Sequence, residues 1–345
     1  MLLSIKVNVE IGVDLLYNVT ITYSEVKQMK NYDHALLVMD KQEYPDEAKE
    51  VIIRAEEKIL RNEKANKIYE AMYRAYWLKK KNFGHFENKV KELAELIDEN
   101  RYTVNLVLLL NCTKPLLAKY KKEGISEEIY WNSIIDLKVK MLECKENYDV
   151  YGTFVEGWFH SFYTLERFGI GRFQYDLSDF CEESYYEHGI ELKDSQFVLG
   201  MHIPSHLGAL TYDVRLDSYK KAYAFFKERY FKDMPMVVCC NSWLLYPDNL
   251  SILPENSNVS DFLLDYEPLD ITRTYDFGDS WRIFGVENNG KPVSELPRKT
   301  SMQRAYAEWF EQGKKAGHAY CILIFDGEKV LTRNTREEYK EKFGY

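Results

Sequence analysis

Apolar and polar positions recur with two different periodicities along this chain, and the change occurs near Tyr151. Before Tyr151, apolar residues recur at spacings of three and four, which is the period of an amphipathic helix. Only the opening, residues 4–11, alternates like a strand. Helices are predicted over residues 46–76, 87–98, 104–120 and 127–145.

Three local signals refine these helices. The run Phe83-Gly84-His85 is expected to interrupt the helical pattern, and Pro115 is expected to kink the helix that contains it. Ser126 stands just before an apolar-periodic stretch, as an N-cap residue does. Residues 1–150 are therefore predicted to form a mainly helical N-terminal domain.

After Tyr151, glycines recur and runs with period two appear, which indicates strands. Their order predicts a mixed β-sheet flanked by helices in a second domain, residues 151–345, so the fold class is α+β (mixed α/β). The first two strands are expected to pair antiparallel. Strands are predicted at 171–177, 197–204, 236–243 and 320–325, a hairpin at 269–285, and helices at 211–230, 260–266 and 300–312.

The most informative segment joins a strand, a small-residue loop and a helix over residues 197–230. The loop contains Gly208, and the helix begins near Thr211. Backbone N–H groups at such a junction can collect around an anion such as a phosphate. Many strand-to-helix turns need a glycine and bind nothing, so the motif indicates a place rather than an activity.

His202 ends the strand of this segment, and period two puts it on the same face as Gly200. Gly200 lacks a side chain, so a ligand could approach the backbone there. Histidine changes charge near neutral pH, so His202 could act as a general base. A structural histidine that bonds the following loop explains the pattern equally well.

The strand at 236–243 carries Cys240 and Ser242 on one face, and Tyr246 follows its end. Ser242 and Tyr246 are expected to lie at a cleft, although a rim tyrosine is the simpler interpretation of Tyr246. A nucleophilic pair of Cys240 with His202 is conceivable. A cysteine in an apolar strand is more often inert packing.

Arg172, Gln174 and Asp176 form a polar stripe along the strand at 171–177. Such a stripe could line a substrate cavity. The solvent-facing side of an antiparallel strand pair gives the same pattern, and we slightly favour that interpretation.

Composition excludes several classes of protein. The chain has 345 residues with 46% hydrophobic and 29% charged side chains, as a folded globular protein has. Its net charge of −9, most of it after Tyr151, argues against a nucleic acid partner or an anionic membrane. It would suit a cationic partner, but a solvated surface explains it more simply.

The six cysteines show no CxxC spacing, which disfavours a zinc site and a disulfide-rich scaffold, so no metal is expected. Lys6 and Glu10 interrupt what would be the apolar core of a signal peptide. The longest apolar run, Leu106–Leu110, is too short to span a bilayer. A cytoplasmic protein without a membrane partner is expected.

Several short motifs in register resemble one known family. They are Gly171-Arg-Phe-Gln174, Met201-His-Ile-Pro204 leading to Gly208-Ala-Leu-Thr211, Ser242-Trp-Leu-Leu-Tyr-Pro247, Leu253-Pro254, Ser257-Asn258 and Pro297-Arg-Lys-Thr300. This string is similar to bacterial acyltransferase-domain proteins that have a helical N-acyltransferase N-terminal domain and a GNAT-like C-terminal domain. The resemblance covers residues 145–326 best.

The resemblance implies an acyl-CoA-dependent N-acyltransferase that uses acyl-CoA or acetyl-CoA as co-substrate and a small-molecule or peptide amine as acceptor. The strand at 197–204 would splay from the strand at 236–243 and hold the pantetheine arm, and the loop would hold the pyrophosphate. His202 would deprotonate the amine, and Ser242 or Tyr246 would protonate the leaving thiolate. The implied CoA-binding residues are Gly200, Met201, Ser205, His206, Leu207, Gly208, Ala209, Leu210 and Thr211.

The loop departs from the family pattern, which is Gln or Arg, two residues, Gly, one residue, then Gly or Ala. Ser205 stands at the first position and Leu210 at the last. Leu210 would crowd a phosphate, and Asp213 adds like charge, which Arg215, Lys220 and Lys221 could partly offset. A GNAT-like domain that has lost catalysis and serves as a binding or assembly module is therefore the alternative.

Overall fold

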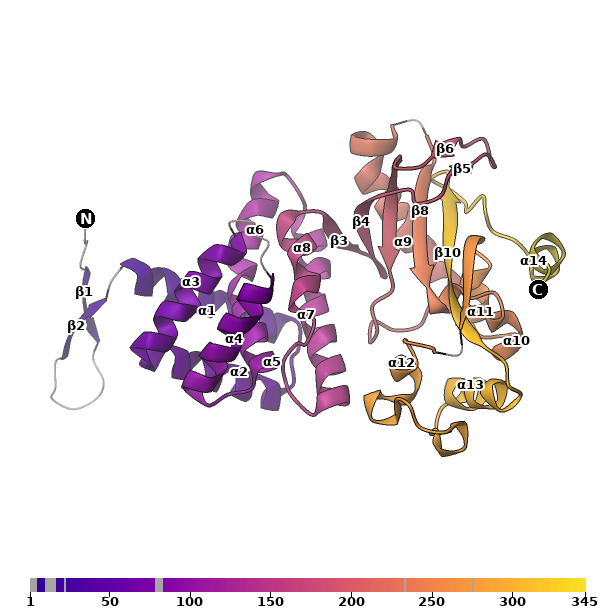
Figure 1. Ribbon diagram of the computed structural model, residues 1–345. Coiled ribbons are helices and arrows are strands. Elements are labelled where there is room, and N and C mark those ends of the chain that lie inside the picture. The colour runs from indigo at the N-terminus through magenta and orange to yellow at the C-terminus, as the bar shows by residue number, and fades with distance from the viewer. Residues whose placement is uncertain (1–4, 10–16, 22, 78–82, 233, 275) are drawn as a thin grey trace. The chain divides into compact units, whose positions relative to one another are not determined.

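The computed structural model describes the backbone of residues 5–9, 17–21, 23–77, 83–232, 234–274 and 276–345, and the side chains of residues 32–74, 87–232, 234–274 and 276–345. The chain forms two compact units (Figure 1). The first comprises Met1–Tyr130 with Lys140–Tyr163, and the second comprises Trp131–Val139 with Thr164–Tyr345. The main division falls after Tyr163, later in the chain than the boundary predicted near Tyr151.

In its described residues, the first unit is helical apart from one antiparallel hairpin, β1 with β2. Helix α7 contributes residues to both units. The elements are β1 (Ile5–Val9), β2 (Tyr17–Ile21), α1 (Tyr23–Lys41), α2 (Asp46–Arg61), α3 (Glu63–Trp77), α4 (Phe83–Ile97), α5 (Arg101–Asn111), α6 (Thr113–Lys122), α7 (Glu127–Tyr148), a 3₁₀ turn (Glu156–Phe159) and α8 (His160–Thr164).

Two details of the predicted helices are wrong, and one is confirmed. The run from Phe83 does not break a helix but begins α4. Pro115 does not kink one long helix, because α5 and α6 meet at Cys112 and Pro115 lies in the first turn of α6, where a missing N–H costs nothing. Ser126 is the N-cap of α7, and its Oγ accepts a hydrogen bond from the Ile129 N–H at 3.3 Å.

Helix α5 is the centre of the first unit. Its residues from Thr103 to Asn111 are all buried, and it packs against α1, α2, α4 and α6. A buried carboxyl group lies in this core: Glu56 of α2 is 1% exposed, and its Oε2 accepts from Asn111 Nδ2 at 2.9 Å. Burial raises the pKa of Glu56 to about 8, and the Asn111 hydrogen bond offsets this only in part.

The second unit is built on a six-stranded sheet in the order β3-β4-β7-β8-β10-β9. Neighbouring strands are antiparallel except β7 and β8, which are parallel. The predicted mixed sheet with helices is confirmed. Its strands are β3 (Arg167–Ile170), β4 (Phe173–Asp179), β7 (Phe197–His202), β8 (Met236–Ser242), β9 (Glu267–Thr274) and β10 (Ala316–Phe325), with a separate hairpin of β5 (Ser184–Tyr185) and β6 (Leu192–Lys193).

Helices of the second unit surround this sheet and complete its core. They are α9 (Tyr212–Phe226) with a π-helical extension (Lys227–Phe231), α10 (Asn249–Ile252), α11 (Asn258–Leu263), α12 (Trp281–Phe284), α13 (Ser301–Glu311) and α14 (Arg336–Phe343), with 3₁₀ turns at Trp243–Leu245, Val286–Asn288 and Val293–Glu295.

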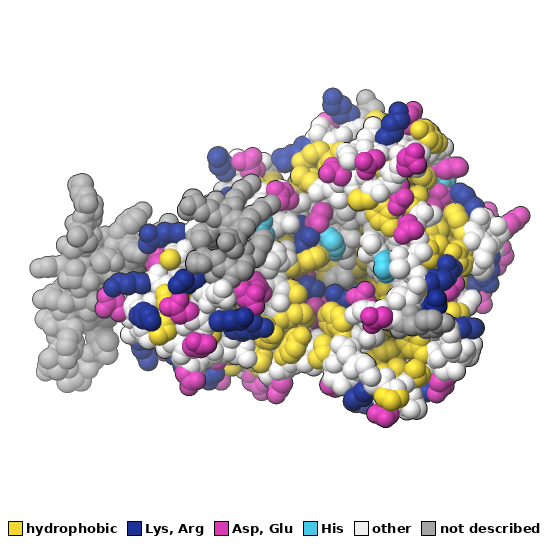
Figure 2. All heavy atoms as spheres, viewed as in Figure 1, with side chains coloured by type: hydrophobic (Ala, Val, Ile, Leu, Met, Phe, Trp, Pro, Cys, Tyr) yellow, Lys and Arg dark blue, Asp and Glu magenta, His cyan; other side chains and the backbone are white. Residues whose placement is uncertain are grey.

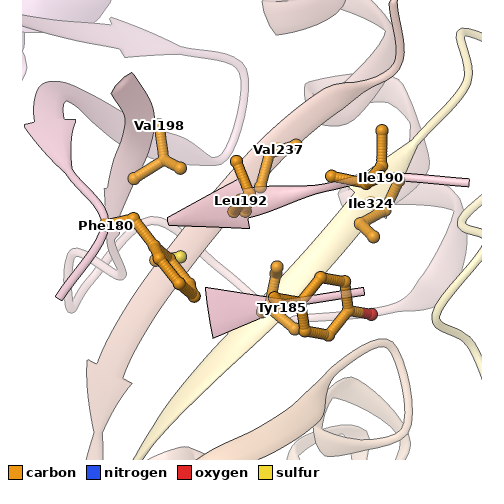
Figure 3. Packing of buried hydrophobic residues seen from close by; sticks show 9 residues of the cluster. Phe180, Tyr185, Ile190, Leu192, Val198, Val237 and Ile324 are labelled. Atoms are coloured by element: carbon orange, nitrogen blue, oxygen red, sulfur yellow. The ribbon is translucent and has the colours of Figure 1, made fainter. Parts of the chain in front are cut away.

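The two faces of the sheet are covered differently. On one face α9 packs against β3 and β4, where the Tyr219 ring stacks on Phe173 at 5.6 Å. On the other face the β5–β6 segment lies over the central strands, and its Leu192 packs with Val198 of β7 and Val237 of β8 (Figure 3). Acidic side chains gather on the outside of this segment (Figure 2). We call these the α9 face and the β5–β6 face. Because side chains alternate along a strand, each strand residue points to one of them and its two neighbours to the other.

Several predicted elements of the second unit are corrected. The expected hairpin at 269–285 does not form: β9 pairs with β10, and residues 281–284 are helical. The expected N-cap at Ser260 is instead at Ser257. Strand β3 was not predicted, and Gly171 turns the chain between β3 and β4 with a φ of 60°. The helix predicted from Thr300 is confirmed, with Thr300 and Gln303 forming a capping box.

Candidate active site

Strands β7 and β8 run parallel at the centre of the sheet, yet they pair over a short stretch. Two residue pairs are registered, the second of them Gly200 with Cys239. Strand β7 continues to His202 and β8 to Ser242 without a further registered pair between them. The backbone groups that these two strand ends turn toward each other are not used by the sheet and can bind an extended ligand.

The loop after β7, residues 205–211, bends through two left-handed residues. His206 has a φ of 58° and Gly208 a φ of 85°. A Cβ on Gly208 would meet no atom within 4 Å, so this position needs glycine for its backbone conformation and not for space. The loop ends at Thr211, the N-cap of α9, whose side chain makes no capping hydrogen bond. The first-turn N–H groups of α9 therefore lack the usual side-chain acceptor.

Two arginines hold carbonyl groups of this loop. Arg172 donates to the Gly208 carbonyl from Nε at 3.3 Å and from Nη2 at 3.1 Å, and Arg215 Nη1 donates to the Leu210 carbonyl at 2.5 Å. The C=O and N–H of a trans peptide point in opposite directions. The N–H groups of Ala209 and Thr211 are therefore directed away from the arginines, and no described residue accepts a hydrogen bond from either.

The structure changes how three residues of the loop and of α9 bear on anion binding. Leu210 is 8% exposed, so its side chain is directed inward and does not crowd the helix terminus. Asp213 is exposed. Arg215 does not supply the offsetting charge that the sequence suggested, because it is fully buried and bound to Asp265 and Asp261.

His202 is part of a cluster of three charged or ionisable side chains on the β5–β6 face. Its Nε2 lies 2.7 Å from Asp176 Oδ2. Arg167 of β3 donates to the same oxygen from Nη2 at 2.8 Å and to Oδ1 from Nε. The His202 side chain is 34% exposed, whereas Arg167 is 7% exposed. Arg167 is thus the buried member of the cluster, and the imidazole of His202 is accessible to solvent.

Asp176 organises this cluster electrostatically. Burial alone would raise its pKa, but the hydrogen bonds and charges of Arg167 and His202 outweigh burial and hold the pKa of Asp176 below its usual range. Asp176 is therefore an acceptor at neutral pH, and His202 Nε2 lies between its carboxylate and Arg167 Nη2, which is 3.3 Å from the same nitrogen.

The polar stripe of β4 is not a solvent-facing surface, so the interpretation favoured from the sequence is wrong. Arg172 is 8% exposed and Gln174 is 2% exposed. Gln174 is registered opposite His202, on the same face of the sheet. In the described part of the chain, neither Gln174 Nε2 nor Arg172 Nη1 has a hydrogen-bond partner. Two buried donors of the stripe are thus unpaired, and one of them, Gln174, is registered opposite the candidate base.

Ser242 and Tyr246 occupy different environments. Ser242 is partly exposed at the end of β8, and its Oγ accepts from the Leu244 N–H at 3.1 Å. Tyr246 is fully buried, and its hydroxyl donates to Asp248 Oδ2 at 2.5 Å. Burial, followed by the contact with Asp248, raises the pKa of Tyr246. Tyr246 therefore lies in the core and not at a cleft, contrary to the expectation.

The conceived Cys240–His202 pair is not formed. Cys239 packs with Val198 on the β5–β6 face, so alternation places Cys240 on the α9 face and His202 on the opposite one. Cys240 is also 2% exposed, and burial raises the pKa of its thiol. A buried neutral thiol on the wrong face of the sheet cannot serve as the nucleophile.

Met201 and Gly200 lie on opposite faces of β7. The Met201 side chain is buried on the α9 face, where Tyr266 donates to its Sδ at 3.2 Å. Gly200 leaves room on the β5–β6 face: a Cβ there would contact Asp176 and Ser178 Cβ atoms at 3.4 Å, an ordinary distance. Met201 could contact a ligand through its backbone only, whereas Gly200 offers open surface beside Asp176.

Neither the role of Arg167 nor the partnership of Asp176 with His202 was predicted from the sequence. Arg167 precedes the predicted strand and carries no pattern of its own. For Asp176, alternation along the strand and the predicted antiparallel pairing indicated that it could lie near the strand of His202. They did not give the register, which places Asp176 opposite Gly200.

Comparison with known proteins gives the same architecture. A family model of the N-acyltransferase N-terminal domain matches residues 33–165, and one of the GNAT-like C-terminal domain matches residues 168–323. No curated protein matches the sequence.

Solved structures of acyltransferases are similar in fold. One, in complex with decanoyl-CoA and teicoplanin, has a TM-score of 0.65 at 19% identity, covering 85% of this chain and 88% of that chain. A mutant acyltransferase in complex with octanoyl-CoA has a TM-score of 0.64 at 19% identity over the same shares. A third, with decanoyl-CoA, has a TM-score of 0.60 at 21% identity, covering 81% and 87%. At these identities the likeness establishes the fold.

Two further features of the described residues bear on the site. They contain no group of three or more His, Cys, Asp or Glu side chains placed to hold a metal ion. No described helix has the length and apolar character needed to cross a membrane.

Proposed function

We propose that this chain, which belongs to the proteins that join an N-acyltransferase N-terminal domain to a GNAT-like C-terminal domain, is an acyl-CoA-dependent N-acyltransferase. It would transfer an acyl group from the thioester to an amine by direct attack in a ternary complex. Direct attack needs a base and a binding groove but no nucleophilic side chain, in agreement with the inert position of Cys240.

The observation that carries this proposal is the position of the His202–Asp176–Arg167 cluster. His202 ends β7 at the place where pairing with β8 has ceased. A co-substrate held between the two strand ends would thus present its reactive end to a histidine that a carboxylate orients. Proximity of the base to the bound thioester is what such a reaction requires.

The backbone of the site supports an acyl-CoA in an extended form. The pantetheine arm carries amides, which match the unused backbone groups of the two strand ends, including that of Met201. The pyrophosphate would lie on the loop from Ser205 to Thr211, where the Ala209 and Thr211 N–H groups are directed away from the protein interior.

The proposed reaction transfers two protons, one from the attacking amine and one to the leaving thiolate. His202 takes a proton from the amine as the amine nitrogen attacks the thioester carbon, and the C–S bond breaks to release the CoA thiolate. The thiolate takes a proton from the partly exposed Ser242, and solvent restores that hydroxyl.

The structural neighbours extend the proposal to the donor. Those proteins were solved with decanoyl-CoA and octanoyl-CoA, and one of them with teicoplanin. For this chain we accordingly propose a medium-length acyl-CoA donor and a small-molecule or peptide amine acceptor. We also propose that it acts in the bacterial cytoplasm, without nucleic acid or membrane partners.

Calorimetry followed by product analysis tests the function. Acetyl-CoA and decanoyl-CoA are titrated into the protein, and the amide product formed with a panel of amines is measured by mass. Product mass is preferable to a thiol reagent, because Cys181 is exposed and would react. Absence of binding by either thioester at millimolar concentration would defeat the proposal.

The alternative of a domain that has lost catalysis loses one of its two sequence arguments. It was based on Leu210 and Asp213: the structure directs Leu210 inward, whereas Asp213 is an exposed carboxylate in the first turn of α9. Binding of acyl-CoA without turnover of any amine would restore it.

A further inference from the structure

Asn241 is an exposed polar residue on a central strand of the sheet. It belongs to β8, which lies between β7 and β10 and whose residues from Met236 to Cys240 are all buried. Asparagine is among the residues that strands usually exclude. No described residue forms a hydrogen bond with the side-chain amide of Asn241. A residue that departs from the pattern of its strand and has no partner in the fold indicates a functional position.

The Asn241 side chain lies on the same face of the sheet as His202. Val198 of β7 and Cys239 of β8 pack in one cluster with the β5–β6 segment, so alternation from them puts both His202 and Asn241 on the β5–β6 face. Tyr320 of β10 is registered opposite Asn241 and packs against the same cluster. Two independent contacts thus assign Asn241 to the face of the candidate base.

Asn241 and His202 occupy matching positions on the two parallel strands. Gly200 of β7 is registered with Cys239 of β8, and His202 and Asn241 each follow two residues later. No registered pair joins the strands beyond Gly200 and Cys239. The two side chains therefore flank the stretch in which the proposed acyl-CoA would lie, with a base on one strand and a hydrogen-bond donor on the other.

An amide at this position suits the charge that forms during acyl transfer. When the amine nitrogen attacks the thioester carbon, the electron pair of the C=O π bond moves to the oxygen, which becomes negative. The pair returns as the C–S bond breaks and the thiolate leaves. A side-chain amide has two N–H groups that can donate to this oxygen without transferring a proton.

We propose that Asn241 is a catalytic residue, whose Nδ2 donates a hydrogen bond to the thioester oxygen and stabilises the oxyanion of the tetrahedral intermediate. The assignment rests on the proposed function for the reaction, whereas a hydrogen bond to the thioester carbonyl requires only bound acyl-CoA. Alternation puts Ser242 on the α9 face, so the two residues would contact the ligand from opposite faces of the sheet and have separate roles.

The kinetic test compares wild type with Asn241→Ala and Asn241→Asp. Asn241→Ala removes the donor and is expected to lower kcat by about 100-fold, a typical cost of losing one oxyanion donor, and to change the KM for acyl-CoA by less than about 2-fold. Asn241→Asp keeps the shape but places a negative acceptor beside the oxyanion, so kcat should fall at least as far. Asn256→Ala, which removes an exposed amide from the turn before α11, is the control and should leave kcat unchanged.

Infrared spectroscopy observes the hydrogen bond without an acceptor amine. The ligand is acyl-CoA labelled with carbon-13 at the thioester carbonyl, and its C=O stretch is expected at a lower wavenumber on wild type than on Asn241→Ala. The melting temperature of the ligand-free protein is expected to be the same for both, because the side chain has no partner in the described structure. A lower melting temperature with an unchanged stretch would make Asn241 structural and overturn the assignment.

The results separate the role of Asn241 from the proposed function. An unchanged kcat and an unchanged stretch in Asn241→Ala overturn the role even if the enzyme transfers acyl groups. A rise in the KM for acyl-CoA with kcat preserved also overturns it, because the amide would then only bind the ground state. A stretch that depends on Asn241 supports it even if no amine is acylated. A wild type that binds no acyl-CoA overturns both.

Discussion

Asp176 and His202 are 26 residues apart in the chain, and Asp176 Oδ2 lies 2.7 Å from His202 Nε2. Antiparallel pairing of β4 with β7 brings them together. Asp176 is opposite Gly200, so His202 is its diagonal neighbour on the same face. The empty position at Gly200 lets the imidazole and the carboxylate meet without an intervening side chain.

Replacement of His202 tests its role as the base. His202→Ala is expected to lower kcat by about 100-fold or more and to leave the dissociation constant of acyl-CoA nearly unchanged, since the base acts on the amine. The measurement is steady-state product formation together with calorimetry. Asp176→Asn is the companion variant, expected to lower kcat less, because the imidazole persists but loses its orienting carboxylate. An equal loss of acyl-CoA binding in both variants would show that the cluster is structural.

The proton donor to the thiolate is assigned by two variants. Ser242→Ala is expected to lower kcat by about 10-fold, whereas Tyr246→Phe is expected to change kcat by less than about 2-fold. Tyr246→Phe should instead destabilise the fold by about 1–3 kcal/mol, because it removes a buried hydrogen bond to Asp248. Rate measurements and chemical denaturation check both. The reverse order of rate effects would make Tyr246 the donor.

Substitutions of Gly200 and Gly208 test two different effects: loss of space for a ligand at Gly200 and backbone strain at Gly208. Gly200→Ala is expected to fold with little change in stability, since its Cβ meets neighbours at 3.4 Å, and to raise the KM for acyl-CoA by several-fold, because the methyl group fills the open face. Gly208→Ala has room for the methyl group but a φ of 85°, so it is expected to cost about 1–2 kcal/mol of stability. Melting curves and KM values for the two variants, taken side by side, decide whether the surface at Gly200 contacts the donor.

Glu56 makes stability depend on pH in a defined direction. Its pKa is about 8 when folded, against an ordinary value of 4.5, so the folded state holds this proton more tightly than the unfolded state. Its contribution is present in full below pH 4.5 and is lost as the pH rises toward about 8, by about 1.4 kcal/mol per pH unit. Glu56→Gln is neutral throughout, so its stability relative to wild type should rise over this window. A constant difference in denaturation midpoints from pH 5 to pH 8 would contradict the assignment.

The sequence was sufficient for the elements that local signals specify. The strand at β7, the helix from Thr211, the N-caps Ser126 and Thr300 and the strand at β8 each follow from periodicity or capping within a short window. The hairpin predicted at 269–285 failed because the partner of β9 is β10, far along the chain. Period two shows that a strand exists but not which strand it pairs with.

The candidate site shows the same limit. His202 and the loop were predicted from local pattern, and both lie where the central strands stop pairing. The inward position of Leu210, the burial of Arg172 and the contact of Arg167 with Asp176 depend on tertiary packing. No spacing rule contains these facts, so the solvent-facing interpretation of the polar stripe and the cleft position of Tyr246 were wrong.

Because β7 and β8 pair over two residue pairs, the sheet consists of two antiparallel halves that are joined by a short stretch of parallel pairing, here called the seam. One half is β3-β4-β7 and the other is β8-β10-β9, each held by its own hydrogen bonds. A bound molecule with amides along its length would act as a missing strand and continue the ladder across the seam. Its binding would tie the halves together, so amide hydrogen exchange at Met201 and Asn241 would slow when the site is filled.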